Sequence, residues 1–415
     1  MVEATAAERQ LQVAELAAMG EVRAALEWFG ASKKWINERH LELCRIPAPT
    51  FQEQARGQWM AARLRELGCQ VRVDRAGNVI AWMGRETAGP VLALTAHLDT
   101  VLAPRGAEEV TLGRDGRFLG PGVSDNGAGL AALLAVAGGV NATAELAVRN
   151  LPIVLIANVG EEGEGNLSGM RYLCRGNGIG ARVHTFLVLD GPSSDHITHR
   201  ALASRRFEIS LTGPGGHSWS DYGVPNPVHA MGRAIAWFAD NLPAAMNGGP
   251  RTSFNFGTID GGTSVNSIPG SARAKVDLRS ESAQRIEELT AMLTAAVERS
   301  LETENERATS GRLQARLREI GSRPGGQLDP AAPVLGCLRA VDAHLRIRSQ
   351  LDCASTDANI PLSLGMHAVS IGAGGQGGGA HTPGEWYHPD GREVALQRIL
   401  LTLLLLERHV SQLAG

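Results

Sequence analysis

The sequence has little net charge, no cysteine pairing and no long apolar segment, and each shortage excludes a class of protein. With 40 basic and 43 acidic residues, its formal net charge of −3 gives no electrostatic footprint for a nucleic acid or an anionic membrane. The longest apolar run, Ile399 to Leu406 with one Thr, is too short to span a bilayer and predicts a buried C-terminal helix. Small metabolites are therefore the expected partners.

The five cysteines are odd in number, far apart and without a Cys-x-x-Cys pair. This pattern does not predict a disulfide framework and favours a reducing compartment. The first twenty residues mix charges into their apolar positions, so they do not have the pattern of a secretory signal. We therefore expect a cytoplasmic protein.

The length of 415 residues exceeds the size at which a single core stops growing, so two domains are expected. Alternation around a turn at 76–78 predicts a hairpin. Runs rich in Val, Ile and Leu, typical of buried strands, are separated by helical segments and occupy 91–96, 152–159, 185–190 and 366–372. These patterns predict an α/β domain, a central mixed sheet flanked by helices, formed by residues 1–202 and 323–415.

The middle of the chain has a different pattern. An alternating strand begins near residue 204, and apolar positions three to four residues apart predict helices over 228–242 and 286–301. Two strands lie between the helices, and a last strand follows the second helix. This order predicts an inserted α+β sandwich over residues 203–322, with its helices on one face of an antiparallel sheet.

Five short segments at strand ends or in glycine-rich loops carry the acidic and histidine residues that we predict to bind metal. Zinc accepts carboxylate oxygen and imidazole nitrogen, and a two-metal site needs one bridging carboxylate plus terminal ligands on each side. The pattern therefore predicts a two-metal hydrolase site with one carboxylate left to move a proton. The residues are His97 in TAHLDT (95–100), Asp125 in GPGVSDNGAG (120–129), Glu161 and Glu162 in ANVGEEGEG (157–165), Asp190 in FLVLDG (186–191) and His381 in GGGAHTPGEW (377–386).

Each position also has a simpler interpretation: a helix cap, a turn, a solvated acidic loop or a tight glycine bend. A solvated acidic loop explains Glu161 and Glu162 less well, because two adjacent carboxylates repel each other unless a cation or proton compensates their charge. One of them can bind metal while the other holds a water and moves its proton. Asp99, two residues after His97, is placed to orient the imidazole.

Together these segments resemble the dinuclear zinc metallopeptidases and amidohydrolases that include aminoacylase, carboxypeptidase G, acetylornithine deacetylase and peptidase T. The resemblance runs from RIPAPTFQE (45–53) to AHTPGEW (380–386), with an insertion where that family has its lid domain. It implies that Asp125 bridges the two zinc ions. His97 and Asp190 would complete one metal site, and Glu162 and His381 would complete the other.

The resemblance implies further roles. Glu161 would be the general base, Asp99 would support His97, and the peptide bond between Asp125 and Asn126 would be cis.

Within the insertion, GPGGHSW matches the segment whose histidine stabilises the reaction oxyanion, here His217. GGTSVNSIPG and VDLRS match segments that hold polar groups of the substrate, which nominates Asn266 and Arg279. Without the resemblance, His217 could be an ordinary surface histidine and Arg279 an ordinary ion-pair partner.

The implied activity is hydrolysis of an amide bond in short peptides by an aminopeptidase or a di- or tripeptidase, with two zinc ions, or cobalt or manganese in their place. Asp190 favours this branch, because peptidase T and the dipeptidases look to carry Asp there, whereas carboxypeptidases and deacylases usually carry Glu. An N-acyl amino acid deacylase or a carboxypeptidase is the alternative, and a non-catalytic metal-binding homologue is a remote one.

The inserted domain also bears on assembly. A small sheet leaves an edge strand that must be covered, and pairing across a twofold axis would cover it. Single-chain relatives tend to have an enlarged lid, which this chain lacks. We therefore expect a homodimer formed through the lid, in which His217 reaches the active site of the other subunit.

Overall fold

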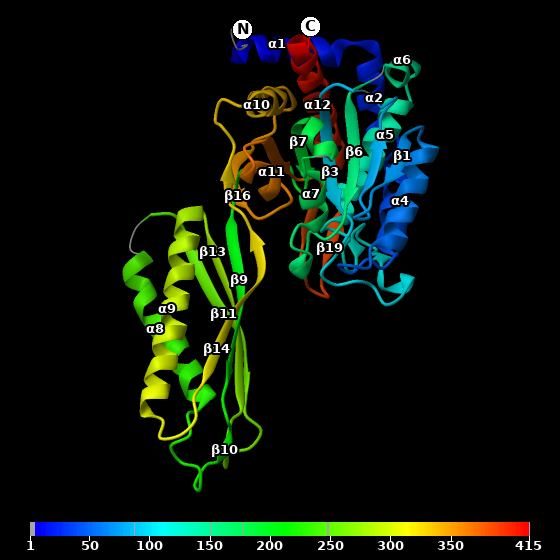
Figure 1. Ribbon diagram of the computed structural model, residues 1–415. Coiled ribbons are helices and arrows are strands. Elements are labelled where there is room, and N and C mark those ends of the chain that lie inside the picture. Colours follow the sequence, from blue (N-terminus) through cyan, green and yellow to red (C-terminus); the bar gives the residue numbers. More distant parts are fainter. Residues whose placement is uncertain (1–4, 87, 150, 177, 247–248, 415) are drawn as a thin grey trace. The chain divides into compact units, whose positions relative to one another are not determined.

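The computed structural model describes residues 5–86, 88–149, 151–176, 178–246 and 249–414 (Figure 1). Its contacts divide the chain into two units, each with its own buried apolar cluster. The larger unit comprises Met1–Ala201 and Gln327–Gly415, and the smaller unit comprises Leu202–Gly326. The smaller unit is thus an insertion in the larger one.

A mixed nine-stranded sheet forms the centre of the described part of the larger unit. Its order is β1-β2-β6-β3-β7-β17-β8-β15, with β16 beside β8. Strands β6, β3, β7 and β17 are parallel neighbours, so their carboxyl ends lie at one edge of the sheet. The strands are β1 (Gln70–Val73), β2 (Val79–Trp82), β3 (Val91–His97), β6 (Ile153–Asn158), β7 (Val183–Leu189), β8 (His196–Ala201), β15 (Gly326–Gln327), β16 (Gln350–Ala354) and β17 (His367–Ile371). The mixed sheet predicted from the apolar runs is confirmed, including the antiparallel β1–β2 hairpin.

Helices cover this sheet, and the most deeply buried is α5 (Gly127–Asn141). Its sequence, GAGLAALLAVAGGVN, is apolar on every side, as expected for a helix covered all round. It contacts β3 and β6 and also the helices α2, α3 and α12. A Cβ atom on Gly138 would lie 2.5 Å from the Trp28 ring, so glycine is needed there for the close packing.

The other helices of the larger unit complete its layers. α12 (Arg392–Ala414) contains the apolar run 399–406, which is buried as predicted. No helix in the described ranges is long and apolar enough to cross a membrane. The remaining helices are α1 (Ala6–Ala18), α2 (Gly20–Ala31), α3 (Lys33–Cys44), α4 (Gln54–Glu66), α6 (Ala144–Val148), α7 (Ser168–Leu173), α10 (Pro333–Leu345) and α11 (Asn359–Ser363).

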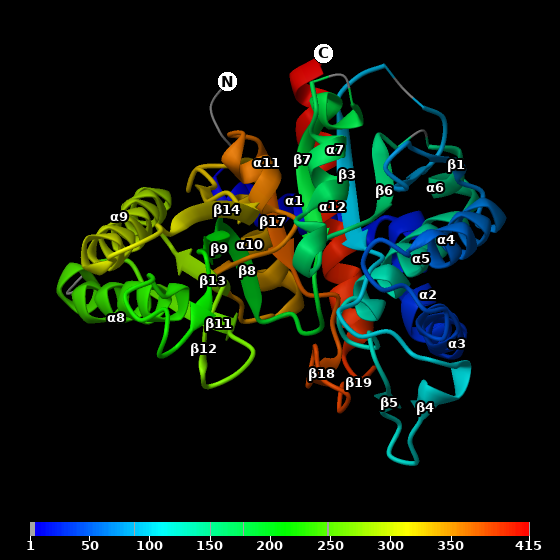
Figure 2. The same cartoon turned by 60° about the horizontal axis from the view of Figure 1, so that its bottom comes forward.

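A second, small sheet of the larger unit joins two segments that are far apart in the sequence (Figure 2). Its order is β18-β19-β5-β4, with β18 at Gln376–Gly378, β19 at Trp386–His388, β5 at Phe118–Leu119 and β4 at Thr111–Leu112. Trp386 pairs with Leu119, and Tyr387 pairs with Phe118. The loops that follow β5 and precede β19 are therefore held side by side.

The smaller unit is an antiparallel sheet with the helices α8 (Pro227–Met246) and α9 (Ala283–Arg307) on one face (Figure 1). The strand order is β11-β13-β9-β14, with β9 at Ala203–Thr212, β11 at Thr252–Gly261, β13 at Ser271–Ser280 and β14 at Gln314–Arg323. A short pair, β10 (Gly216–His217) with β12 (Ser267–Ile268), extends from it. The predicted α+β insertion is confirmed.

Candidate metal site

The predicted ligands meet where the parallel strands end. His97 is the last residue of β3, Asp190 follows β7, and Glu161 and Glu162 come shortly after β6. Ligand atoms of His97, Asp125 and Glu162 all lie within 4.8 Å of one another. Because neighbouring parallel strands end at the same edge, residues far apart in the sequence are brought to one place.

Asp125 is the centre of this cluster. Its Oδ1 lies 3.1 Å from His97 Nε2, and its Oδ2 lies 3.0 Å from His381 Nε2. The same His381 nitrogen lies 2.8 Å from Glu162 Oε1. Each oxygen of one carboxylate thus faces a different histidine, which is the arrangement that a carboxylate bridging two metals requires.

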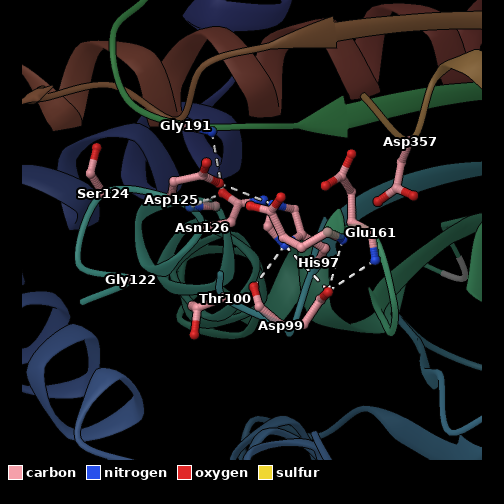
Figure 3. Close-up of polar contacts among 12 residues, drawn as sticks. His97, Asp99, Thr100, Gly122, Ser124, Asp125, Asn126, Glu161, Gly191 and Asp357 are labelled. Atoms are coloured by element: carbon pink, nitrogen blue, oxygen red, sulfur yellow. Dashed lines mark hydrogen bonds and ion pairs between the residues drawn. The ribbon is translucent and has the colours of Figure 1, made fainter. Parts of the chain in front are cut away.

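The segment around Asp125 performs two tasks at once (Figure 3). Asn126 is the N-cap of α5, and its Oδ1 accepts a hydrogen bond from Gly129 N at 3.1 Å. Its Nδ2 donates to Leu189 O at 2.8 Å, which ties this loop to the one carrying Asp190. The Asp125–Asn126 peptide bond is cis, as the family resemblance predicts. Helix capping therefore falls to Asn126, and Asp125 is left to face the histidines.

The electrostatics of the cluster reflect a local excess of carboxylates. Burial and the neighbouring Asp125 raise the pKa of Asp190 to about 8. Hydrogen bonds with Asp125 and Glu162 raise the pKa of His381 to about 10. Burial lowers the pKa of His97, but hydrogen bonds with Asp125 and Asp99 outweigh it and hold that pKa well above its usual value. The site therefore attracts positive charge, as a cation-binding site must.

Asp99 supports the cluster in a way that differs in detail from the expectation. His97 Nδ1 lies 2.9 Å from the backbone oxygen of Asp99 but 3.6 Å from its carboxylate, which is long for a hydrogen bond. The Asp99 carboxylate instead accepts hydrogen bonds from Glu161 N at 3.0 Å, Glu162 N at 2.9 Å and Thr50 Oγ1 at 2.9 Å. Asp99 therefore also fixes the two glutamates, which are both buried.

Further buried charges lie around the site and were not singled out from the sequence, among them Glu385, Glu53 and Arg56. Glu385 accepts three backbone N–H groups of the Asp125 loop, and Glu53 accepts Gly160 N at 3.0 Å. The Arg56 guanidinium donates to the backbone oxygens of Ile46 and Leu98 at 2.7–3.0 Å. Sequence signals exist for Glu385, which lies four residues after His381, and for Glu53, which ends the segment RIPAPTFQE. An arginine in a predicted helix is otherwise expected at the surface.

Two family models match parts of the chain. Residues 197–305 match the peptidase dimerisation domain, and residues 78–207 match peptidase family M28. Both matched models describe peptidase domains, and each covers less than a third of the chain. A succinyl-diaminopimelate desuccinylase of Thioalkalivibrio sulfidiphilus is 27% identical over 265 residues, which are 57% of this chain and 66% of that protein. The chain thus spans slightly less than two thirds of the length of this relative.

Solved structures of several peptidases share the fold. A tripeptidase of Staphylococcus aureus superposes with a TM-score of 0.72 and 20% identity, covering 90% of this chain and 98% of the tripeptidase. A dinuclear metal-binding peptidase of family M20 from Bacillus subtilis superposes with a TM-score of 0.65 and 16% identity, covering 91% and 99% of the two chains. At these identities the likeness shows the shared architecture of the two units.

The residues that the resemblance nominates in the dimerisation domain lie in two places. His217 on β10 is adjacent to Asn266, whose backbone oxygen accepts Ser218 N at 3.0 Å. Trp219 and Tyr222, in the loop after His217, are 86% and 88% exposed. Arg279 lies at the other end of the sheet, roughly 26 Å along β13 from Ser271, and forms an ion pair with Asp277 at 2.7 Å.

Proposed function

We propose that this chain is a two-zinc hydrolase of amide bonds in short peptides, an aminopeptidase or a di- or tripeptidase. The observation that carries the proposal is the position of Asp125, whose two oxygens face His97 at 3.1 Å and His381 at 3.0 Å. Imidazole and carboxylate are donors that zinc accepts, and cobalt or manganese would accept the same set. His97 and Asp190 would complete one metal site, and Glu162 and His381 would complete the other.

The proposed chemistry is divided between the two metals and the carboxylate of Glu161, which we do not assign as a metal ligand. Two bound zinc ions would polarise the scissile carbonyl and make a water molecule more acidic. Glu161 is buried next to the ligand Glu162, and its backbone N–H is fixed by Asp99. It would accept a proton from the attacking water and deliver that proton to the leaving amine nitrogen as the C–N bond breaks. Such acid–base catalysis contributes about 10²–10⁴-fold.

The inserted domain would complete the site. His217 would donate a hydrogen bond to the carbonyl oxygen as negative charge develops there, which is the role of an oxyanion donor. Asn266, which is adjacent to His217, and Arg279 would hold polar groups of the substrate. A retained, buried general base argues against a non-catalytic homologue, because metal binding alone does not need Glu161.

A deacylase of N-acyl amino acids is the second candidate, because the desuccinylase relative matches 57% of this chain. Asp190 favours the peptidase on the family resemblance. The two activities differ in whether the substrate presents a free amine.

The discriminating experiment is to remove metal with a chelator, reload the protein with zinc, cobalt or manganese, and assay four substrates in parallel. These are a dipeptide, a tripeptide, the N-acetylated tripeptide and an N-succinyl amino acid. We expect metal-dependent cleavage of the free peptides and little cleavage of the acylated compounds. Preference for the N-succinyl amino acid would establish the deacylase, and no hydrolysis of any substrate would overturn both.

We also propose that the protein is a homodimer in which His217 acts in the active site of the partner subunit. Support comes from the match of residues 197–305 to a peptidase dimerisation domain. The exposed strand β11 at one edge of its sheet offers backbone groups for pairing across a twofold axis. A cytoplasmic location stays a prediction from the cysteine content.

Subunit mixing tests the shared site. Glu161→Gln and His217→Ala proteins, each inactive alone, are combined under conditions that exchange subunits. A mixed dimer has one site with both wild-type residues, so part of the activity should return. Mixed dimers that form without recovering activity, or a native protein that sediments as a monomer, would contradict the proposal.

A further inference from the structure

Glu385 lies where the two ligand loops meet, although no role has been assigned to it. It follows His381 by four residues and directly precedes β19. The pairing of β19 with β5 sets it beside the chain that leads to Asp125. Its residue exposure is only 3%, so its charge is buried among protein groups.

The contacts of Glu385 are concentrated on the loop that carries Asp125. Its Oε2 accepts Gly122 N at 2.8 Å, and its Oε1 accepts Ser124 N at 2.7 Å and Asp125 N at 2.9 Å. Its own backbone oxygen accepts Gly120 N at 3.1 Å. Four N–H groups of residues 120–125 therefore bind one residue of the His381 loop.

This geometry requires a carboxylate. A buried carboxylate next to other carboxylates is unfavourable unless hydrogen-bond donors compensate it, and here three backbone N–H groups do so. A glutamine could keep the bonds to one oxygen, but its NH₂ group would then face the N–H of Gly122, donor against donor. The backbone of Asp125 is thus held by a charge that itself does not contact the two histidines.

We infer that Glu385 is a positioning residue for the metals: it fixes the carboxylate of Asp125 relative to His381 so that both metals bind together. The inference rests on the proposed two-metal site. Because Asp125 would serve both metals, a change in its position weakens both sites at once. Within the described residues, the side-chain contacts of Glu385 are with backbone N–H groups, so we expect its effect on metal affinity.

The test is zinc affinity and stoichiometry, measured by competition with a chromophoric chelator on fully folded protein. Loss of a group that orients ligands typically lowers metal affinity about 10–100-fold. We expect a fall of that size for Glu385→Gln at both sites, and a smaller fall for Glu385→Asp, which keeps the charge on a shorter side chain. With excess zinc, KM should equal that of the wild type and kcat should recover.

Asp74 provides a matched control, because its Oδ1 also accepts three backbone N–H groups, those of Ala76, Gly77 and Asn78, at 2.8–3.0 Å. It lies in the turn between β1 and β2, at the edge of the sheet. Asp74→Asn should lower the melting temperature and leave zinc affinity unchanged.

Hydrogen exchange gives a second readout that does not depend on activity. In protein stripped of metal, the backbone N–H groups of Gly122, Ser124 and Asp125 should exchange faster in Glu385→Gln than in the wild type, while those of Asp74's turn should not. Wild-type zinc affinity in Glu385→Gln, a loss at one metal only, or an equal loss in Asp74→Asn would each overturn the inference. Fewer than two zinc ions on the wild type would instead refute the proposed two-metal site.

Discussion

Zinc binding should release protons from ligands whose pKa is raised. Three predicted ligands have raised pKa values: His381 at about 10, Asp190 at about 8, and His97 well above its usual range. At pH 7 the two histidines therefore carry their protons, and Asp190 carries its proton in about nine-tenths of the molecules. Metal ligands must be deprotonated, so loading both sites at pH 7 should displace about two protons from His381 and Asp190, and the raised pKa of His97 adds to this release.

The sign of the pH dependence follows. Because protons compete with zinc, the apparent affinity rises with pH, by about tenfold per pH unit for each proton displaced. The rise should become shallower towards pH 9, because Asp190 has by then lost most of its proton and no longer contributes to the release. The same protons favour the folded state of metal-free protein, whose stability should therefore fall as pH rises from 7 to 9.

Calorimetry can count these protons. The zinc-binding enthalpy is measured at pH 7 in buffers of different ionisation enthalpy, and the slope gives the number of protons released. Asp190→Asn should lower this number by about one, because its amide has no proton to lose in this range. Release of less than one proton by the wild-type protein would refute the assignment of these residues as protonated ligands.

Three substitutions test individual roles. Glu161→Gln should keep both metals by elemental analysis and lower turnover by about 10²–10⁴-fold, and loss of a metal would mean that Glu161 and Glu162 have exchanged roles. Asp125→Ala should empty both sites, and retention of nearly two zinc ions per chain would contradict its bridging position. Asp99→Ala should be milder, about 10–100-fold in metal affinity or activity, and wild-type values for both would remove its supporting role.

The meeting of the strand-end residues could be predicted because local pattern and topology agree. Buried runs of Val, Ile and Leu identify parallel strands, and such strands must end at one edge, where His97, Asp190 and the two glutamates then meet. The position of Asp125 was ambiguous, since a carboxylate before a helix is also a good cap. In the structure the cap of α5 is Asn126, whose Oδ1 accepts a hydrogen bond from Gly129 N, and Asp125 is not needed for capping.

Other parts of the site could not be predicted, because their partners are backbone groups or lie far away in the sequence. Glu385 binds Asp125 N across 260 residues, and a sequence does not show which backbone N–H groups a loop leaves to be bound. Arg56 binds carbonyl oxygens in the same way. The family resemblance supplied a role for Arg279. No sequence pattern indicated that Arg279 lies at the other end of β13 from the β10–β12 pair that contains His217.

Five acids of this region fall into two kinds according to what compensates their charge. Asp99, Glu53 and Glu385 accept backbone N–H groups, which are fixed dipoles supplied by the fold itself. Asp125 and Glu162 have carboxylate contacts with imidazoles, whose charge depends on a proton. Only the second kind can exchange its compensating proton for a metal ion without losing backbone structure. The backbone hydrogen bonds can therefore hold the loops of Asp125 and Glu162 in place while a metal ion replaces the protons of the neighbouring imidazoles.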